Sequence, residues 1–233
     1  MGALEIIPVI DLLDNHVVHA RYGERHHYKP IQSTLSVTSL PLDIVQGLLK
    51  LYPFKQLYIA DLNAVQKRGN HRTVIASIIN AYPALNILLD CGISSTDDLV
   101  DWKSLDVEFV IGSENLDSVE TYTSIPQDHQ HILSLDFGQN SCLGPQQLFN
   151  EPGLWPEKVI AMTLSQVGSE AGPAMARLND LISKSNGKKI YAAGGIRHTA
   201  DLQALKKIGL SGVLVATALH SGAITSAEIS RLS

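Results

Sequence analysis

Residues 190–202, IYAAGGIRHTADL, join a short apolar run to a helical pattern through two adjacent glycines. An apolar run of this length is typical of a strand buried on both faces of a parallel sheet. The helical pattern begins near Thr199 and ends before Gly209, in agreement with the capping preferences of threonine and glycine. The stretch therefore predicts a strand–turn–helix unit with Gly194 and Gly195 in the turn.

Runs of this kind recur along the whole chain, with helical patterns between them. We expect strands at residues 6–10, 56–60, 86–89, 108–111, 131–135, 158–162, 189–193 and 212–215, and helices at 41–51, 95–102, 173–185 and 199–208. Eight such units in 233 residues predict an α/β fold, a closed (β/α)8 TIM barrel forming one domain over residues 1–233. An open, doubly wound sheet is the structural alternative.

Two of these helices carry predicted N-terminal caps. Ser95 and its neighbours precede Asp97 and Asp98, which predicts a serine or threonine cap with acidic residues at the positive end of the helix dipole. Thr199 is the expected cap of the helix at 199–208. Both helices would then begin at the carboxyl end of a barrel strand.

The chain also contains an internal repeat. DCGISSTDDL at 90–99 matches AGGIRHTADL at 193–202, IGSE at 111–114 matches VATA at 215–218, and VIDL at 9–12 matches SLDF at 134–137. The first match aligns Gly92 with Gly195, 103 positions further on. A repeat over half the chain predicts two related half-barrels.

Composition excludes several classes of function. The net charge of −5 gives no reason to expect nucleic acid as a partner, and no apolar run approaches the ~18 residues that a membrane span needs. Cys91 and Cys142 are the only cysteines, which fits free thiols in a reducing compartment and makes the cytoplasm the expected location. Nothing indicates a partner protein.

Two aspartates occupy matching positions at strand ends. Asp11 ends the first expected strand and Asp136 ends the fifth, and these strands face each other in a ring of eight. Facing carboxylates at the catalytic end of a barrel can act as acid and base on opposite sides of a small substrate. The alternative is that each carboxylate only caps the turn that follows it.

The glycine pair predicts an anion site. Glycines allow backbone amides to approach a phosphate at a helix start, and the loops after strands seven and eight are the usual phosphate site of this architecture. The turn at Ala216 and Thr217 follows strand eight and would add further amides. A tight turn without a ligand is the alternative interpretation of Gly194 and Gly195.

The first loop concentrates basic side chains close to Asp11. They are His16, His19, Arg21, Arg25, His26, His27 and Lys29. An anion-binding lid over the barrel mouth and a solvated, partly mobile loop are both consistent with this pattern. A metal site is disfavoured because adjacent histidines chelate poorly and no acidic cluster accompanies them. We expect no metal and no cofactor.

The motifs IIPVIDL, YIADLNAVQKRGN, FVIGSENLDS, HILSLDFG, IYAAGGIRHTADLQAL and GVLVATALHSGAI, taken in this order, resemble the isomerase and cyclase family of histidine biosynthesis. The resemblance extends from residue 6 to about residue 224 and is closer to the isomerase, which acts on phosphoribosylformimino aminoimidazole carboxamide ribotide (ProFAR). It implies an Amadori rearrangement of a small phosphorylated ribosylamine to its ketose, without metal or cofactor.

The resemblance also implies roles for individual residues. Asp11 is similar to the general base that moves the proton at the second sugar carbon, and Asp136 to the general acid that opens the furanose ring. Asp136 would need a raised pKa to hold its proton. The residues similar to substrate- and phosphate-binding positions are Asp61, Gly112, Ser113, Thr163, Gly194, Gly195, Ala216, Thr217 and His19, which replaces an arginine.

The chain departs from the family pattern after the third strand. A glycine triplet followed by Ile-Arg usually begins the family's other phosphate site, whereas here Asp90 and Cys91 precede Gly92, and Ser94 replaces the arginine. A carboxylate ~4 Å from a phosphate is repelled by about 4 kcal/mol at an effective dielectric near 20. Glu114 adds to the acidic trend.

Three functional hypotheses follow. The first is an isomerase of histidine biosynthesis with an unusual second phosphate site. The second is a paralogue that acts on a mono-phosphorylated substrate in another pathway, since isomerase-like paralogues occur beside one-carbon and pterin-cofactor genes. The third is a non-catalytic barrel that binds a ligand or a partner. Asp11 and Asp136 argue against the third hypothesis, and Asp90 argues against the first.

Overall fold

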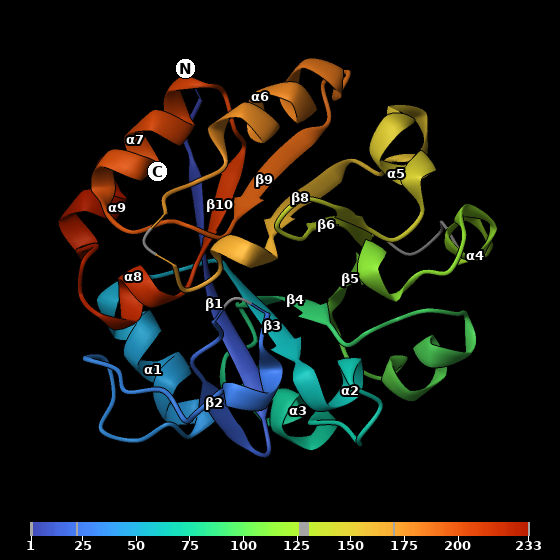
Figure 1. Cartoon of the computed structure of the whole chain (residues 1–233). Coiled ribbons are helices and arrows are strands. Elements are labelled where there is room, and N and C mark those ends of the chain that lie inside the picture. The colour runs from blue at the N-terminus through green and yellow to red at the C-terminus, as the bar shows by residue number, and fades with distance from the viewer. Residues whose placement is uncertain (1, 22, 126–130, 170, 233) are drawn as a thin grey trace.

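The computed structural model describes residues 2–21, 23–125, 131–169 and 171–232. Eight parallel strands surround a central axis, with helices outside them (Figure 1). These strands are β1 (Glu5–Leu13), β3 (Gln56–Asp61), β4 (Asn86–Asp90), β5 (Glu108–Gly112), β6 (His131–Phe137), β8 (Lys158–Thr163), β9 (Lys189–Ala193) and β10 (Gly212–Val215). Pairing of β10 with β1 closes the ring, so the predicted TIM barrel is confirmed.

All eight predicted strands are present. Those at 189–193 and 212–215 have the predicted limits, and the other six continue one to three residues further at their carboxyl ends. Asp61, Asp90, Gly112 and Thr163 are therefore the last residues of their strands. Strand pairing fixes the direction of these side chains more firmly than a loop would.

Two short strands were not predicted. β2 (His16–Val18) pairs antiparallel with the end of β1, and β7 (Cys142–Leu143) pairs antiparallel with the end of β6. Their registers correspond, because Asp11 lies opposite Val18 and Asp136 lies opposite Leu143. Equivalent hairpins at the first strand of each half are what the internal repeat predicts.

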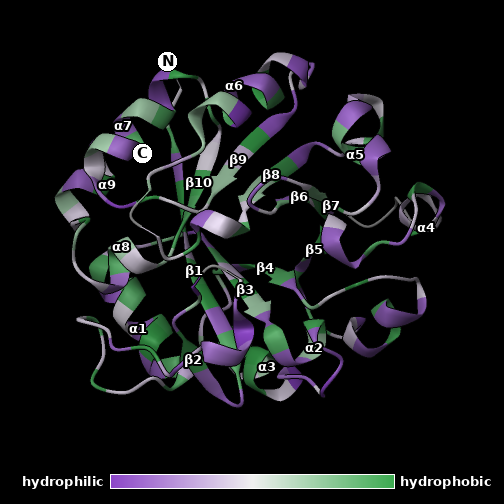
Figure 2. Ribbon diagram, in the orientation of Figure 1, coloured by the Kyte–Doolittle hydropathy of each residue, from purple (hydrophilic) through white to green (hydrophobic). Residues whose placement is uncertain are grey.

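The helices outside the ring begin and end near the predicted limits in three of four cases. α1 (Pro41–Leu51) has the predicted limits, while α6 (Met175–Lys184) and α7 (Thr199–Lys207) are slightly shorter than predicted. The other α-helices of the described residues are α2 (Leu62–Val65), α3 (Arg72–Ala81), α4 (Val119–Ser124), α5 (Gln146–Asn150), α8 (Thr217–His220) and α9 (Ser226–Leu232). Hydrophobic and hydrophilic residues alternate along outer helices such as α6 and α7 (Figure 2), as expected for helices with one face on the core.

Both predicted caps were wrong. Residues 95–102 form no α-helix but a 3-10 helix, η2 (Asp97–Trp102), without a side-chain cap. Instead, Asp98 Oδ2 accepts hydrogen bonds from the backbone N–H groups of Ser94 and Ser95, at 2.8 and 2.9 Å. The N-cap of α7 is His198, which provides no side-chain cap, and the Thr199 hydroxyl donates to Glu228. The expected hydroxyl caps are therefore absent from both helices.

Side chains alternate between the barrel interior and the surrounding helices. One buried cluster takes a residue from every barrel strand: Ile7, Tyr58, Leu88, Val110, Ile132, Ile160, Tyr191 and Leu214. Their neighbours along the strands pack with the helices in a second, larger cluster. Since successive side chains of a strand point to opposite faces, Asp11 shares the interior face with Ile7, and Asp136 shares it with Ile132.

The described helices were also compared with the length needed to cross a bilayer. None of them combines enough residues with enough apolar character for a transmembrane span.

Candidate active site

A pocket of about 390 Å³ opens among the carboxyl ends of the barrel strands. Asp11, Asp90 and Asp136 line it together with Ala193 and Ala216. Asp11, Asp90, Asp136 and Ala193 each lie an even number of positions after an interior residue of their own strand, so strand alternation directs them into the mouth, while Ala216 follows the end of β10. The ring order places β1 opposite β6 and β4 opposite β9.

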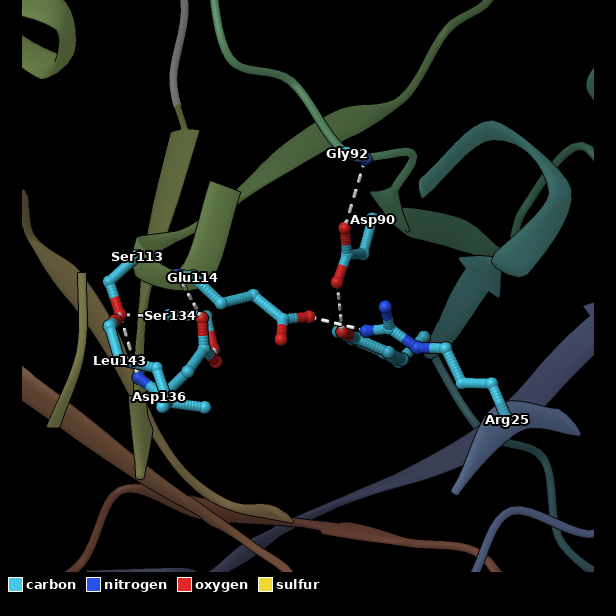
Figure 3. A network of polar contacts seen from close by, with 9 residues as sticks. Arg25, Asp90, Gly92, Ser113, Glu114, Ser134, Asp136 and Leu143 are labelled. Carbon is cyan, nitrogen blue, oxygen red and sulfur yellow. Dashed lines mark hydrogen bonds and ion pairs between the residues drawn. The ribbon is translucent and has the colours of Figure 1, made fainter. Parts of the chain in front are cut away.

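Asp136 is held by hydrogen bonds from three groups. Its Oδ1 accepts from the Ser134 hydroxyl at 2.7 Å, and its Oδ2 accepts from the Ser113 hydroxyl at 3.3 Å and the Glu114 backbone N–H at 3.0 Å. The carboxylate is only 4% exposed, and burial raises its pKa to about 8 although these bonds act in the opposite direction. Figure 3 shows these contacts, which hold the Asp136 carboxyl group in a fixed orientation, and its raised pKa favours the protonated form at neutral pH.

Asp11 lies across the mouth in a different environment. No donor among the described residues forms a hydrogen bond with its carboxylate, which lines the pocket. Burial, and to a lesser extent the Asp90 carboxylate, raise the pKa of Asp11 to about 7, although Arg25 acts in the opposite direction. A carboxylate with a pKa near neutrality and free oxygens is suited to accept a proton from a bound molecule.

We call Asp90, Gly92 and Ser94 the β4 rim. The backbone N–H of Gly92 donates to Asp90 Oδ1 at 3.2 Å, and the Tyr58 hydroxyl donates to Asp90 Oδ2 at 3.0 Å. Burial is the main reason that the pKa of Asp90 rises, to about 6. The Gly92 amide, which a phosphate would need, is thus already bonded to the chain's own carboxylate.

We call Ala193, Gly195 and Arg197 the β9 rim. Gly194 and Gly195 have φ angles of +97° and +79°, and a Cβ atom on Gly195 would lie 2.2 Å from the Gly172 carbonyl oxygen. Only glycine fits this turn without strain. No acceptor among the described residues takes the Gly195 N–H, and Gly195 lines the pocket. This amide is available as a donor to a bound molecule.

The turn after β10 completes this end of the pocket. Ala216 and Thr217 line it, and Thr217 begins α8. His19 from the first loop approaches Thr217, with its Nε2 3.2 Å from Thr217 Oγ1. Burial, and to a lesser extent Arg21, lower the pKa of His19 and so favour the neutral imidazole, which offers either a donor or an acceptor.

The first loop reaches across the mouth. Arg25 forms an ion pair with Glu114, which follows β5, and Tyr28 of the same loop also lines the pocket. Figure 3 shows the Glu114 side chain extending between Asp136 and Arg25. His26 and His27 contact each other and are exposed. No group of three metal-ligating side chains is found among the described residues.

Four residues expected at the site do not line the pocket. Asp61 is buried on the helix side, where it accepts from the Ala64 and His71 backbone N–H groups and pairs with the His71 ring at 2.8 Å. Thr163 accepts from Arg177. Strand alternation explains both positions, because each residue follows an interior residue by an odd number. Gly112 and Ser113 lie against Asp136 rather than the cavity.

Sequence analysis missed Tyr58 as a site residue. It lies within β3, three residues before the strand end, and its hydroxyl reaches Asp90 through the barrel interior. The sequence contains the signal that identifies it: Tyr58 lies two residues before Ala60, and alternate residues of a strand point to the same face, here the barrel interior. Arg25 was included only as one of seven basic residues, and its pairing with Glu114 required the fold.

The sequence matches a known protein family. The model of the family described as histidine biosynthesis protein matches residues 5–225. An uncharacterized protein of Methanocaldococcus jannaschii is 30% identical over 232 residues, covering 97% of each chain.

Two further relatives carry functional names. Proteins of Pasteurella multocida and Campylobacter hominis are named 1-(5-phosphoribosyl)-5-((5-phosphoribosylamino)methylideneamino) imidazole-4-carboxamide isomerase. The first is 26% identical over 246 residues, with 95% of this chain and 94% of the relative covered. The second is 24% identical over 238 residues, with 95% and 96% covered.

Proposed function

The chain belongs to the histidine biosynthesis protein family, and from that premise we propose that it is an isomerase of phosphorylated sugar amines. Asp11 and Asp136 form its acid–base pair, and the amides of the β9 rim bind the phosphate. The observation that carries this proposal is one pocket lined by Asp11, Asp136 and Gly195. The two carboxyl groups face each other and have near-neutral pKa values, and the Gly195 amide has no acceptor among the described residues.

The reaction is an aldose–ketose rearrangement. Asp136 donates its proton to the ring oxygen of the ribosylamine, which opens the furanose and leaves an iminium at the first carbon. Asp11 then removes the proton from the second carbon. The resulting enolamine takes up a proton at the first carbon and loses the proton of the hydroxyl on its second carbon, which gives the aminoketose and returns a proton to Asp136. Protons are redistributed and no atom is gained or lost, so the rearrangement consumes no oxidant.

The pKa order supports this division of roles. Asp136, with a pKa of about 8, is protonated at pH 7.5, whereas Asp11, with a pKa of about 7, is largely ionised. The three donors around Asp136 fix its orientation, while Asp11 keeps its oxygens available. An acid and a base prepared in these states at one pH need no prior proton exchange.

Solvent exchange tests the proposal directly. An N-aryl ribosylamine 5-phosphate and ProFAR are each incubated with the protein in D2O and followed by NMR. We expect deuterium at the first sugar carbon of the product and formation of the ketose from at least one of them. A protein that binds these compounds but produces neither signal would be a binding barrel rather than an isomerase.

A second candidate concerns the number of phosphates. The Gly92 amide is bonded to Asp90, whereas the equivalent Gly195 amide has no acceptor among the described residues, which favours a substrate with one phosphate. We expect the protein to bind the mono-phosphorylated ribosylamine more tightly than ProFAR. Asp90→Gly combined with Ser94→Arg should then improve ProFAR binding, measured by calorimetric titration. Tight ProFAR binding by the unmodified protein, or complementation of an isomerase-deficient histidine auxotroph, would favour the ordinary histidine-pathway isomerase instead.

A further inference from the structure

The wall of the pocket at β4 presents hydrogen-bond acceptors. Asp90 has two carboxylate oxygens, each of which accepts one bond within the chain, from Gly92 and from Tyr58. A carboxylate has about four lone-pair sites, so acceptor capacity is left on both oxygens. Tyr58 uses its only hydroxyl proton on Asp90, so its oxygen can only accept from a bound molecule.

The positive charge near this wall is already balanced. Arg25 is paired with Glu114 and also experiences the Asp90 charge, which contributes to a raised pKa of the guanidinium. Asp90 and Glu114 therefore face one arginine. A phosphate group, which has only acceptor oxygens at neutral pH, would meet acceptors of the same charge there.

The β9 rim, on the facing strand, has the opposite character. Its Gly195 amide has no acceptor among the residues that the structure describes, and Ala193 stands where the internal repeat would place Asp90. The pocket is therefore polarised, with donors for an anion at one end and acceptors for a donor group at the other. A substrate that matches both ends carries unlike groups at its two ends.

We propose that Asp90 and Tyr58, with Glu114 beside them, form a subsite for a nitrogen-bearing, hydrogen-donating end of the substrate, such as an amine, an amidine or an amino-substituted ring. This inference rests on the proposed function, because it assumes that the phosphate binds at the β9 rim. Asp90 is then a specificity-determining residue that accepts from the substrate nitrogen and excludes a second phosphate.

Three probes of equal length isolate the far end of the ligand. Hexyl phosphate, 6-aminohexyl phosphate and 1,6-hexanediol bisphosphate share one phosphate and one linker, and differ only in the group that reaches the β4 wall. We expect the unmodified protein to bind the amine about tenfold more tightly than the bisphosphate in calorimetric titrations, since one pairing is attractive and the other repulsive. Hexyl phosphate should lie between them.

Asp90→Asn keeps the shape of the side chain and removes its charge. The preference for the amine over the bisphosphate should fall to within about threefold in this variant. Asp97→Asn is the matched control, because it removes the same charge from an exposed position in the same segment, outside the pocket. The control should keep the full preference.

The outcomes separate this inference from the proposed function. The donor subsite is refuted if the bisphosphate binds at least as tightly as the amine, or if Asp90→Asn keeps the preference.

The phosphate end is tested separately with Gly195→Ala, which should weaken the binding of all three probes equally. If Gly195→Ala does not fold, Ala193→Asp takes its place. Unchanged affinities in both variants would refute the phosphate end and the subsite together.

Discussion

The β4 rim and the β9 rim are equivalent positions of two related half-barrels, and they differ in one decisive side chain. Both contain a glycine in the left-handed region, Gly92 at φ +71° and Gly195 at +79°. In both, the amide two residues later is bonded to an aspartate of the following helix, since Ser94 donates to Asp98 and Arg197 donates to Asp201.

The difference is Asp90 in one half and Ala193 in the other. Asp90 occupies the amide of its own rim, whereas the methyl group of Ala193 leaves the Gly195 amide free. We interpret the shared backbone as one that can serve as a phosphate site or as an acceptor wall, and the side chain at the Asp90 or Ala193 position as the group that selects between them.

The comparison also shows what the two halves share. Asp11 and Asp136 lie near the carboxyl ends of the first strands of their halves, and each lies opposite a residue of a short hairpin strand. We interpret the duplicated carboxylates as the chemical part of the site and the unequal rims as the part that selects the ligand.

The largest effect should follow from changing the shared pair. Asp11→Asn and Asp136→Asn should each lower turnover of the ribosylamine 5-phosphate by about 10²–10⁴-fold, because an amide cannot transfer the proton. Steady-state kinetics measures the loss, and circular dichroism with hexyl phosphate titration checks that fold and ligand binding persist. Near-normal rates in both variants would show that the acid and base are other groups.

The same pair sets the pH dependence of turnover. Asp11 must be ionised and Asp136 protonated, so activity should be highest between about pH 7 and 8, decreasing below pH 7 as Asp11 is protonated and above pH 8 as Asp136 ionises. The two apparent values belong to the pair. A flat pH profile from 6 to 9 would contradict the assignment.

An intermediate effect should follow from making the β9 rim resemble the β4 rim. Ala193→Asp places a carboxylate next to the Gly195 amide and should weaken hexyl phosphate binding about tenfold or more, because two like charges would share one site. Ala193→Asn is the matched control, which adds similar bulk without charge. Equal losses in the two variants would mean that volume, not charge, separates the two rims.

The smallest effect concerns stability. The pKa of Asp90 is raised to about 6 in the folded chain, so its stabilising contribution is full below an unfolded value near 4 and is lost as the pH rises through about 6. Asp90→Asn should therefore gain stability relative to the unmodified protein as the pH rises from 4 to 7. The rise in pKa from near 4 to about 6 corresponds to about 3 kcal/mol, from which the loss of one accepted hydrogen bond subtracts, because an amide nitrogen cannot accept. Urea unfolding at several pH values measures this gain, and a constant difference across the range would exclude Asp90 as its source.

The sequence predicted the site unevenly, and strand alternation explains why. Asp11, Asp136, Gly195 and Thr217 line the pocket as expected. Asp61 also ends a barrel strand, but it lies on the other face and bonds to His71 instead. When a strand is placed one residue out of position, the predicted direction of every side chain counted from its end is reversed.

The amino-acid sequence by itself determined the barrel, its two related halves, the facing aspartates and the glycine turn, because these depend on local periodicity and on residues adjacent in the chain. Only the tertiary structure decided that Tyr58 reaches Asp90, that Arg25 pairs with Glu114, and that Asp90 occupies the Gly92 amide. The first two contacts join strands or loops far apart in sequence, and the third depends on the rotamer of one side chain. Closing the ring brings these groups into one poorly solvated pocket, and this desolvation raises the pKa values of Asp11 and Asp136 to about 7 and 8.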